Sequence, residues 1–358
     1  MVHKPFITEG MHLEHVQRHR RVRRGIEDLL LSWGYRPVET PLLDDYDSYR
    51  NHLSAQLESD SYRLIDRSGT VMLLRSDITL FLACQLGRHV TPDELPLRVS
   101  YAGNIVRYQS DEEIHSGDTF QAGAELIGVD GTEGDAEILL LAAQLFRDLQ
   151  IRDAALHIGS RRLLQLAWPD AEPAELEAIA AAVRYRRFDQ VAEHSRTAGR
   201  LTPDAAVRLF GGIADASYFA PDAIAPSKDT PTDILAEVSR IAELAQLVQE
   251  LEPDMQVRVD FSEVGAREYY SGMAFQMYCA GAARPVAGGG RYDSLLQDFG
   301  CGASSVGFSV VQSVIEPLAT LSLDPDSDRI SSVHDAGDLR SRHLQAQSMR
   351  AEGKKVHL

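Results

Sequence analysis

The sequence predicts an α+β fold: an antiparallel sheet flanked by helices. Short runs rich in Val, Leu and Tyr are separated by Gly, Asp and Ser, as is typical of strands joined by turns. Longer stretches with apolar residues at helical spacing lie between these runs, and a stretch rich in Ala, Glu and Arg interrupts them in the middle of the chain. With 358 residues, 44% of them apolar, the chain can bury one large core or two moderate ones.

The first predicted segment, residues 1–165, begins with a long helix. Its apolar residues recur at helical spacing and are Val22, Ile26, Leu29, Leu30 and Trp33. The basic run RHRRVRR, from Arg18 to Arg24, then faces outward, either as a solvated helix face or as a contact for an anion or a partner. The strand-like runs SYRLID and TVMLLRSD follow, then a predicted helix from Asp135 to Leu149 and a strand, AALHIG.

Three further segments complete the chain. Residues 166–242 are predicted to form a helical insertion, because Ala, Glu and Arg dominate and proline-containing breaks divide the stretch. Strands resume in residues 243–319 with MQVRVDF, YYSGMAFQMY and AGGGRYD, whose three glycines predict a turn before a helix. Residues 320–358 hold one helical stretch and a closing KKVHL, which predicts a truncated C-terminal segment rather than a domain of ordinary size.

The chain is strongly acidic. A formal net charge of −17 repels the phosphate backbone of nucleic acids, so no nucleic-acid partner is expected. Apolar runs of about 18 residues are absent, and the N-terminal MVHKPFITEG lacks the pattern of a secretion signal. We therefore expect a cytoplasmic protein without a membrane contact. The cysteines Cys84, Cys279 and Cys301 are far apart in the sequence and are expected to be buried thiols.

Five sequence elements occur in an order that resembles the histidyl-tRNA synthetase branch of the class II aminoacyl-tRNA synthetases. GYRPVETPLL (34–43) is similar to motif 1, a dimer-interface element, and LLRSDIT (73–79) to the LRPEGT element. RVSYAGNIVRYQSDEEIHSGDTFQAGAELIG (98–128) is similar to motif 2, and SEVGAREYYSGMAFQMY (262–278) to the histidine-specific RGLDYY element. AGGGRYD (287–293) resembles the start of motif 3. The resemblance implies a class II synthetase-like sheet flanked by helices.

The resemblance also implies an amino-acid pocket whose polar residues are retained. Carboxylate and amide oxygens accept hydrogen bonds from an α-ammonium group, and a tyrosine hydroxyl can bond to a ring nitrogen of imidazole. The expected histidine-like pocket comprises Asp77, Thr79, Arg107, Gln121, Glu125, Tyr269 and Tyr270. A purely structural role remains possible for two of these residues, since Asp77 and Glu125 could be carboxylates whose hydrogen bonds only stabilise the fold. On a strand, adjacent tyrosines point to opposite faces, so at least one of Tyr269 and Tyr270 would pack in the core.

The arginines that would bind ATP are largely absent. In the synthetase pattern three arginines stabilise the charge that develops on the phosphate oxygens beside the substrate carboxylate. Only the motif 2 arginine remains, as Arg107, because Gly265 and Val314 occupy the other two positions. Losing one such donor typically lowers a rate about 10²- to 10³-fold, so efficient amino-acid activation is not expected. Arg267 would share the face of Gly265 on a strand and is the candidate for compensation.

A retained pocket, a lost ATP clamp and a shortened C-terminus together resemble the regulatory subunit of ATP phosphoribosyltransferase, a paralogue of histidyl-tRNA synthetase. Motif 2 agrees, since Gln109 replaces the usual acid and the loop after it has lost basic residues. The resemblance implies a homodimeric subunit without catalytic activity or cofactor and without a metal. It would be required by the short-form catalytic subunit in the first step of histidine biosynthesis and would take part in feedback inhibition by histidine.

Two alternatives remain open at this point. The first is a divergent histidyl-tRNA synthetase whose site is rebuilt from neighbouring residues. The second is a ligase or binding module that uses the same fold on another amino acid or on a protein. Histidine-dependent pyrophosphate exchange would reveal the first, and thermal-shift screening against amino acids with ATP would reveal the second.

Overall fold

The computed structural model describes residues 13–108, 118–216, 230–265, 267–320, 330–332, 339–352 and 355–357. The chain divides into two units, residues 1–319 and residues 320–358. Gln109 and residues 115–117 of the rewritten motif 2 loop lie outside the described residues, whereas residues 118–120 of that loop begin strand β6. Among the described helices, none is both long enough and apolar enough to cross a membrane.

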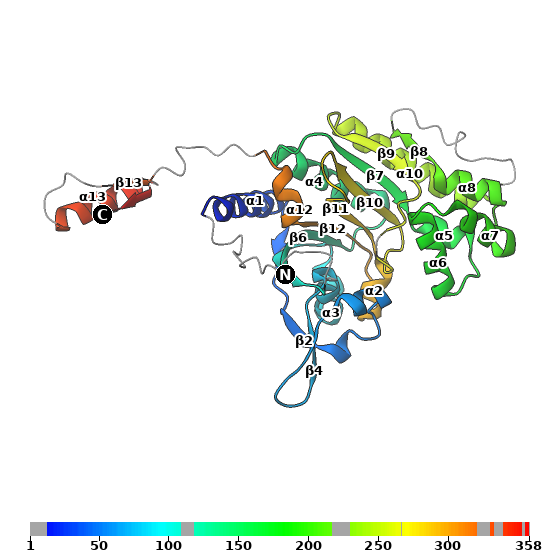
Figure 1. Ribbon diagram of the computed structural model, residues 1–358, viewed down its shortest axis with the longest axis horizontal. Helices are drawn as coiled ribbons and strands as arrows, with labels where there is room; N and C mark the ends of the chain where they lie inside the picture. Colours follow the sequence, from blue (N-terminus) through cyan, green and yellow to red (C-terminus); the bar gives the residue numbers. More distant parts are fainter. Residues whose placement is uncertain are drawn as a thin grey trace, which may run out of the picture. The chain divides into compact units, whose positions relative to one another are not determined.

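A nine-stranded sheet forms the centre of the first unit (Figure 1). Strands β5, β6, β12, β11, β10 and β7 pair antiparallel in that order, whereas β1 pairs with β5 and β9 with β7 in parallel. Across the sheet the strands are β1 (Arg36–Pro37), β5 (Leu97–Val106), β6 (Asp118–Ile127), β12 (Ser305–Val311), β11 (Ala287–Arg291), β10 (Met273–Cys279), β7 (Ala154–Ser160), β9 (Gln256–Asp260) and β8 (Ile213–Asp215). The predicted α+β class is confirmed, with a sheet that is mixed at its margins.

One face of this sheet carries the candidate site. Residues two apart on a strand share a face, so Gln121, Gly123 and Glu125 of β6 lie on the same side. Gly307 of β12 pairs in register with Glu125, and Gly290 of β11 pairs with Gly307. Glycines on the two neighbouring strands therefore leave room above the sheet for the Glu125 side chain.

Helix α3 (Ile78–His89) covers this face. Its Ile78 and Leu82 pack with Val99 and Tyr101 of β5 in one hydrophobic cluster, and Val99 pairs in register with Glu125. The helix begins where it does because Asp77 caps it: its carboxylate accepts the backbone N–H of Leu80 at 3.1 Å. The same cap places Asp77 and Thr79 over the sheet.

Helices α4 (Gly131–Asp148) and α10 (Thr232–Leu251) cover the opposite face, where α4 packs on β6 and β12 and α10 on β7 and β9 (Figure 1). Arg291 follows Gly290 on β11 and therefore points away from Glu125. There its guanidinium contacts the buried carboxylate of Asp135 on α4 at 2.8 Å. Arg240 of α10 contacts the same carboxylate at 2.8 Å, so one acid joins both helices to the sheet.

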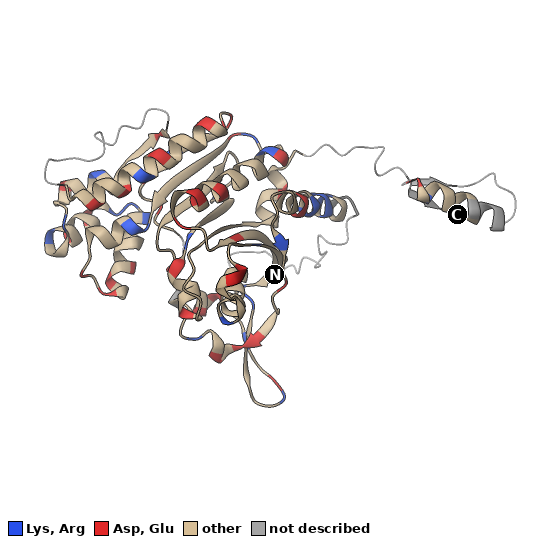
Figure 2. Ribbon diagram, turned by 180° about the vertical axis from the view of Figure 1, so that it is seen from behind, with Lys and Arg blue, Asp and Glu red and all other residues tan. Residues whose placement is uncertain are grey.

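The N-terminal helix α1 (Leu13–Ser32) has the predicted apolar face. Val22, Ile26, Leu29 and Leu30 are buried, as their spacing predicts. Basic residues cluster on this helix (Figure 2), and Arg18, Arg20, Arg23 and Arg24 are exposed whereas Arg21 is partly buried. Arg18 has a structural role there, since it donates hydrogen bonds to the carbonyl oxygens of Glu316 at 2.8 Å and Ala319 at 3.0 Å.

Smaller elements complete the first unit. A three-stranded sheet has the order β2-β4-β3 and consists of β2 (Leu43–Asp45), β4 (Val71–Leu74) and β3 (Arg63–Ile65). The remaining helices are α2 (Ala55–Asp60), α5 (Arg162–Ala167), α6 (Pro173–Arg184), α7 (Phe188–Ala198), α8 (Pro203–Gly211), α11 (Asp293–Asp298) and α12 (Gln312–Ile315). Short 3₁₀ turns lie at Tyr46–Ser48, Pro92–Glu94 and Glu316–Leu318. The second unit contains β13 (Ile330–Ser332), α13 (Leu339–Ala351) and β14 (Lys355–His357), with β13 and β14 paired in parallel.

The predicted turn at Gly288–Gly290 is wrong, because all three glycines lie within strand β11. Their lack of side chains serves close packing. A Cβ on Gly290 would lie 2.6 Å from the carbonyl oxygen of Met273 and 2.9 Å from the Tyr270 ring. The prediction for the cysteines is confirmed, since Cys84, Cys279 and Cys301 are buried free thiols.

Candidate functional site

The seven predicted pocket residues come together between the N-terminus of α3 and the covered face of the sheet. Asp77 and Thr79 begin α3, Gln121 and Glu125 lie on β6, and Arg107 follows β5. Tyr269 and Tyr270 lie in the segment before β10. The seven residues come from three of the five sequence elements that resemble the synthetase motifs.

Glu125 is the most buried acid of the site, with 1% exposure. Its Oε1 accepts a hydrogen bond from Thr79 Oγ1 at 2.8 Å, and its Oε2 accepts one from the Tyr292 hydroxyl at 2.5 Å. Tyr101 extends the network, since its hydroxyl lies 3.1 Å from Thr79 Oγ1. Three hydroxyl groups therefore surround one carboxyl group, and among the described residues no Lys, Arg or His forms an ion pair with it.

This environment favours the protonated form of Glu125. Burial raises the pKa of the Glu125 carboxyl from 4.5 to about 8, and the hydrogen bonds from Tyr292 and Thr79 only partly oppose that rise. The negative charge of Asp77 raises the pKa further. The site thus holds a carboxyl group that would become a strong acceptor once a cation entered.

Asp77 is the charged acid of the site and contacts two arginines. Its Oδ2 lies 3.1 Å from Arg267 Nη2 and 3.7 Å from Arg107 Nη2. Burial and the neighbouring Arg267 lower the pKa of Arg107. Burial also acts to lower the pKa of Arg267, but Asp77, together with smaller contributions from Tyr269, Tyr270 and Asp60, raises it overall. The Asp60 carboxylate also raises the pKa of both arginines, so two guanidinium groups lie near two carboxylates. A guanidinium has five N–H donors, so either arginine can bind a further anionic group beside Asp77.

Gln121 and Arg107 hold the backbone at the N-terminus of α3. The side-chain oxygen of the buried Gln121 accepts the backbone N–H of Ile78 at 3.4 Å. Arg107 Nε donates to the carbonyl oxygen of Ser76 at 2.7 Å. Both side chains therefore hold the backbone on either side of Asp77, which leaves the second Arg107 nitrogen directed at the Asp77 carboxylate.

The expectation that Tyr269 and Tyr270 lie on a strand is wrong, because β10 begins only at Met273. Both rings are partly buried and pack against the same hydrophobic cluster, with their centroids 5.1 Å apart. Tyr269 also meets Tyr292 edge to face at 5.8 Å. A turn, with different backbone angles at each residue, lets adjacent tyrosines reach one cluster, which a strand would prevent.

The position of the missing arginine in the histidine-specific element is sterically closed. Gly265 has a φ of +84°, a conformation that favours glycine, and a Cβ there would collide with the Tyr270 ring. Arg267 is not on the strand that sequence reasoning assumed, yet it reaches the site through its contact with Asp77. Val314 lies in the short helix α12 after β12, where the motif 3 arginine is expected.

A second polar cluster, which the sequence did not single out, lies at strand β7 and the end of strand β9. Ligand-type atoms of His157, Asp260 and Glu263 lie within 4.8 Å of one another. Each already has a protein partner: Asp260 bonds to His157 at 3.0 Å, and Glu263 accepts the hydroxyl of Tyr278. Arg186 lies 3.4 Å from the Asp260 carboxylate, so these groups form a satisfied network rather than a vacant cation site.

Sequence reasoning missed Tyr292 and Tyr101 as members of the site. Tyr292 belongs to the GGGRYD segment and Tyr101 to the motif 2 strand, so both were within quoted motifs. Their signal is weak, because a lone tyrosine in a strand or at a helix start is usually a packing residue. Only the pairing of β6, β11 and β12 shows that both hydroxyl groups approach Glu125 or its partner Thr79.

The fold and site define the histidyl-tRNA synthetase-like class, and the model of the histidyl-tRNA synthetase family matches residues 8–315. A regulatory subunit/histidyl-tRNA synthetase structure from Bacillus halodurans superposes with a TM-score of 0.79 at 20% identity, covering 99% of this chain and 92% of that chain. The apo histidyl-tRNA synthetase of S. aureus superposes with a TM-score of 0.63 at 20% identity, covering 99% and 84%. These two likenesses show the fold.

Two curated relatives identify the branch. The ATP phosphoribosyltransferase regulatory subunit of Moorella thermoacetica is 30% identical over 305 residues, covering 81% of this chain and 75% of the relative. The subunit of the same name from Bacillus licheniformis is 27% identical, covering 94% and 86%. The chain belongs to the ATP phosphoribosyltransferase regulatory subunits, a non-catalytic family within the histidyl-tRNA synthetase-like class. The family expected from the sequence is confirmed.

Proposed function

We propose that this chain binds free histidine in the pocket of Asp77, Arg107, Glu125, Arg267 and Tyr292 and passes its occupancy to a catalytic ATP phosphoribosyltransferase subunit. The observation that carries the proposal is the charge arrangement of the pocket. Two arginines contact the Asp77 carboxylate, and the same site holds a buried carboxyl group, Glu125, that forms no ion pair with the described residues. An α-amino acid supplies both complements, since its carboxylate suits the arginines and its ammonium group suits Glu125.

Loss of the phosphate clamp supports binding without activation. An arginine at position 265 would require the Tyr270 ring to move, and position 314 holds valine. Arg267 contributes a second cation, but its partner Asp77 already holds it at 3.1 Å. An amino acid can therefore be bound while the transition state of adenylation lacks its usual charge stabilisation.

The proposed partner is the short-form catalytic subunit, which condenses ATP with phosphoribosyl pyrophosphate in the first step of histidine biosynthesis. Relatives named as its regulatory subunit cover most of this chain. A chain of the ATP phosphoribosyl transferase complex from Thermotoga maritima shares the fold, with a TM-score of 0.61 at 17% identity. This pathway operates in the cytoplasm, where we place the chain, and the net charge of −17 argues against a nucleic-acid partner.

A homodimer through the motif 1 region belongs to the same proposal. The small β2-β4-β3 sheet exposes large apolar side chains, which usually mark an interaction surface. They are Leu42, Leu43, Leu64, Ile65 and Val71, of which Ile65 is 76% exposed. An Ile65→Asp variant should shift the mass measured by light scattering from dimer to monomer, and an unchanged dimer would place the interface elsewhere.

Activity of the catalytic subunit tests the whole proposal. The short-form catalytic subunit is assayed with and without this chain over a range of histidine concentrations. We expect the chain to raise the activity and histidine to lower it only when the chain is present. The coupling free energy between histidine binding and catalytic activity is typically about 1 to 3 kcal/mol. A pocket variant that loses this coupling should therefore raise the half-inhibitory histidine concentration about 5- to 150-fold. Activity that ignores both the chain and histidine would refute the proposal.

A further inference from the structure

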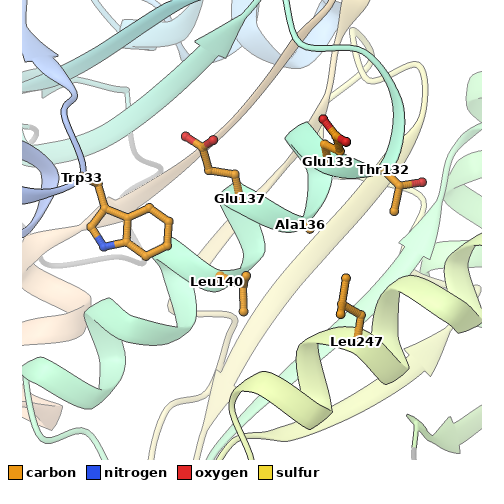
Figure 3. A pocket seen from close by; sticks show the side chains of 7 residues that line it. All are labelled: Trp33, Thr132, Glu133, Ala136, Glu137, Leu140 and Leu247. Atoms are coloured by element: carbon orange, nitrogen blue, oxygen red, sulfur yellow. The ribbon is translucent and has the colours of Figure 1, made fainter.

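An apolar groove lies on the outer side of the helical layer, on the face of the sheet opposite Glu125. It has a volume of about 390 Å³ and lies among α1, α4 and α10 (Figure 3). Leu140 of α4 and Leu247 of α10 point into the gap between their helices, and Trp33 lies beside Leu140 (Figure 3). Leu247 is 39% exposed. Such a hollow is typical of a surface that a partner covers.

The groove is preformed. Trp33 is held in place by a hydrogen bond from its indole N–H to Gln144 Oε1 at 2.9 Å. An ion pair joins the two helices that form its walls, since Arg240 of α10 contacts the buried carboxylate of Asp135, which belongs to α4. A ligand would therefore meet fixed walls and lose little free energy in ordering them.

The charged groups at the groove are acidic. Glu133 and Glu137 lie along α4 on the side away from Leu247 (Figure 3). Glu137 is already neutralised, because Arg98 donates to both of its oxygens and Tyr35 to one. Glu133 is exposed and has no ion-pair partner among the described residues. On α10, Glu243 and Glu250 are exposed one turn to either side of Leu247.

This chemistry excludes two occupants. A second copy docking by the same face would bring its own Glu133 and Glu243 against these acids, because a two-fold interface is self-complementary. An anionic membrane surface would be repelled for the same reason. The complement is an apolar segment flanked by Lys or Arg, on a different protein.

We propose that this groove docks an apolar segment, flanked by basic residues, of the ATP phosphoribosyltransferase catalytic subunit. The proposal rests on the function proposed above and adds the place of contact. A short structural connection leads from the groove to the ligand pocket: Asp135 of α4 binds Arg291, and the next residue, Tyr292, donates to Glu125. Two consecutive residues of the chain therefore connect the groove helix to the group that we expect to bind the histidine ammonium.

Binding of the full-length chain to its cognate short-form catalytic subunit tests this inference by calorimetry. Leu247→Asp should raise the dissociation constant about tenfold or more, because it places a charge at the centre of an apolar contact. Glu133→Lys, on an exposed side chain that does not affect folding, should also weaken binding and reduce its dependence on salt.

The matched control is Ile213→Asp on the edge strand β8. Ile213 is 41% exposed, close to the 39% of Leu247, and does not line the groove. Its variant should bind like the unchanged chain, to within about twofold. Groove variants that bind like the unchanged chain would overturn this inference alone. Failure of the unchanged chain to bind the catalytic subunit would overturn the proposed function and the inference with it.

Discussion

The hydroxyl of Tyr292 donates a hydrogen bond to Glu125 Oε2 at 2.5 Å, although the two residues belong to different sequence motifs. Tyr292 comes from the GGGRYD segment and Glu125 from the motif 2 strand. Gly307 of β12 pairs in register with Glu125, and a side chain there would collide with the Glu125 carboxyl group. The contact therefore depends on three strands at once, and it leaves a buried carboxyl group bonded to hydroxyl groups instead of a cation.

The first prediction concerns the pH dependence of stability. Glu125 has a pKa of about 8 in the folded chain and about 4.5 when unfolded, so between these values the folded state keeps a proton that the unfolded state loses. Stability should therefore fall as pH rises through this window, by at most about 1.4 kcal/mol per pH unit for one group. Burial raises the pKa of Glu263 to about 7, which adds to the fall below that pH.

Urea unfolding at several pH values between 5 and 9 measures this slope. The variant Glu125→Gln removes the titrating group and should flatten the curve, most clearly above pH 7, where Glu263 contributes little. Glu133→Gln, at an exposed acid without an ion pair among the described residues, is the control for the loss of one carboxylate. A free energy of unfolding that increases with pH over this range would contradict the assignment.

The second prediction concerns Gly265. Gly265→Ala should destabilise the chain through both its φ of +84° and the collision of the new Cβ with the Tyr270 ring. Gly281→Ala is the matched control, because Gly281 has a φ of +87° and no atom within 4 Å of the added Cβ. We expect about 1 kcal/mol for the control, from the backbone alone, and clearly more for Gly265. Equal losses in thermal unfolding would mean that Tyr270 moves aside freely.

The third prediction concerns the acid beneath the groove helices. Asp135 is fully buried and pairs with Arg240 and Arg291, so Asp135→Asn leaves two guanidinium groups without their carboxylate. Breaking a buried pair of this kind typically costs about 3 to 5 kcal/mol. Asp233→Asn, which breaks the exposed pair with Arg200, should cost no more than about 1 kcal/mol. Similar shifts of the two variants in urea unfolding would show that the buried network is dispensable.

The fourth prediction concerns Arg267. Arg267→Met should weaken histidine binding about 10- to 100-fold, because a charge-assisted hydrogen bond to the ligand carboxylate contributes about 1.5 to 3 kcal/mol. Arg267→Lys should recover part of the loss, since it keeps the charge but not the planar fork. Arg200→Met, at an exposed pair remote in sequence from the site motifs, is the control. If Arg267→Met binds histidine with unaltered affinity, Arg267 does not contact the ligand carboxylate and the prediction is wrong.

Sequence patterns predicted the fold class, helices α1 and α4 and several of the strands, but they did not predict helix α3, which begins at the candidate site. They succeeded because burial follows periodicity directly, as for Val22, Ile26 and Leu29 on α1. They failed at Gly288–Gly290, where three consecutive glycines predicted a turn but form part of strand β11. The physical reason for these glycines is the close approach of neighbouring strands and of Tyr270, which depends on residues distant in the sequence.

The candidate site shows the same limit. The order of the motifs was enough to assign Asp77, Thr79, Gln121 and Glu125 to one pocket. Each of these residues keeps a fixed position within a motif that resembles the family pattern. The local conformation of residues 267–270 could not be read in the same way, since a strand pattern and a turn before a strand look alike. The role of Arg267 depended on that difference, and so did the common packing of Tyr269 and Tyr270.

The central claim is that this pocket binds an amino acid without activating it. Calorimetric titration of histidine into the chain alone, with and without Mg·ATP, tests that claim most directly. We expect one saturable site per chain whose affinity does not change when Mg·ATP is added, with no pyrophosphate released. Absence of histidine binding, or binding that requires Mg·ATP and releases pyrophosphate, would contradict it.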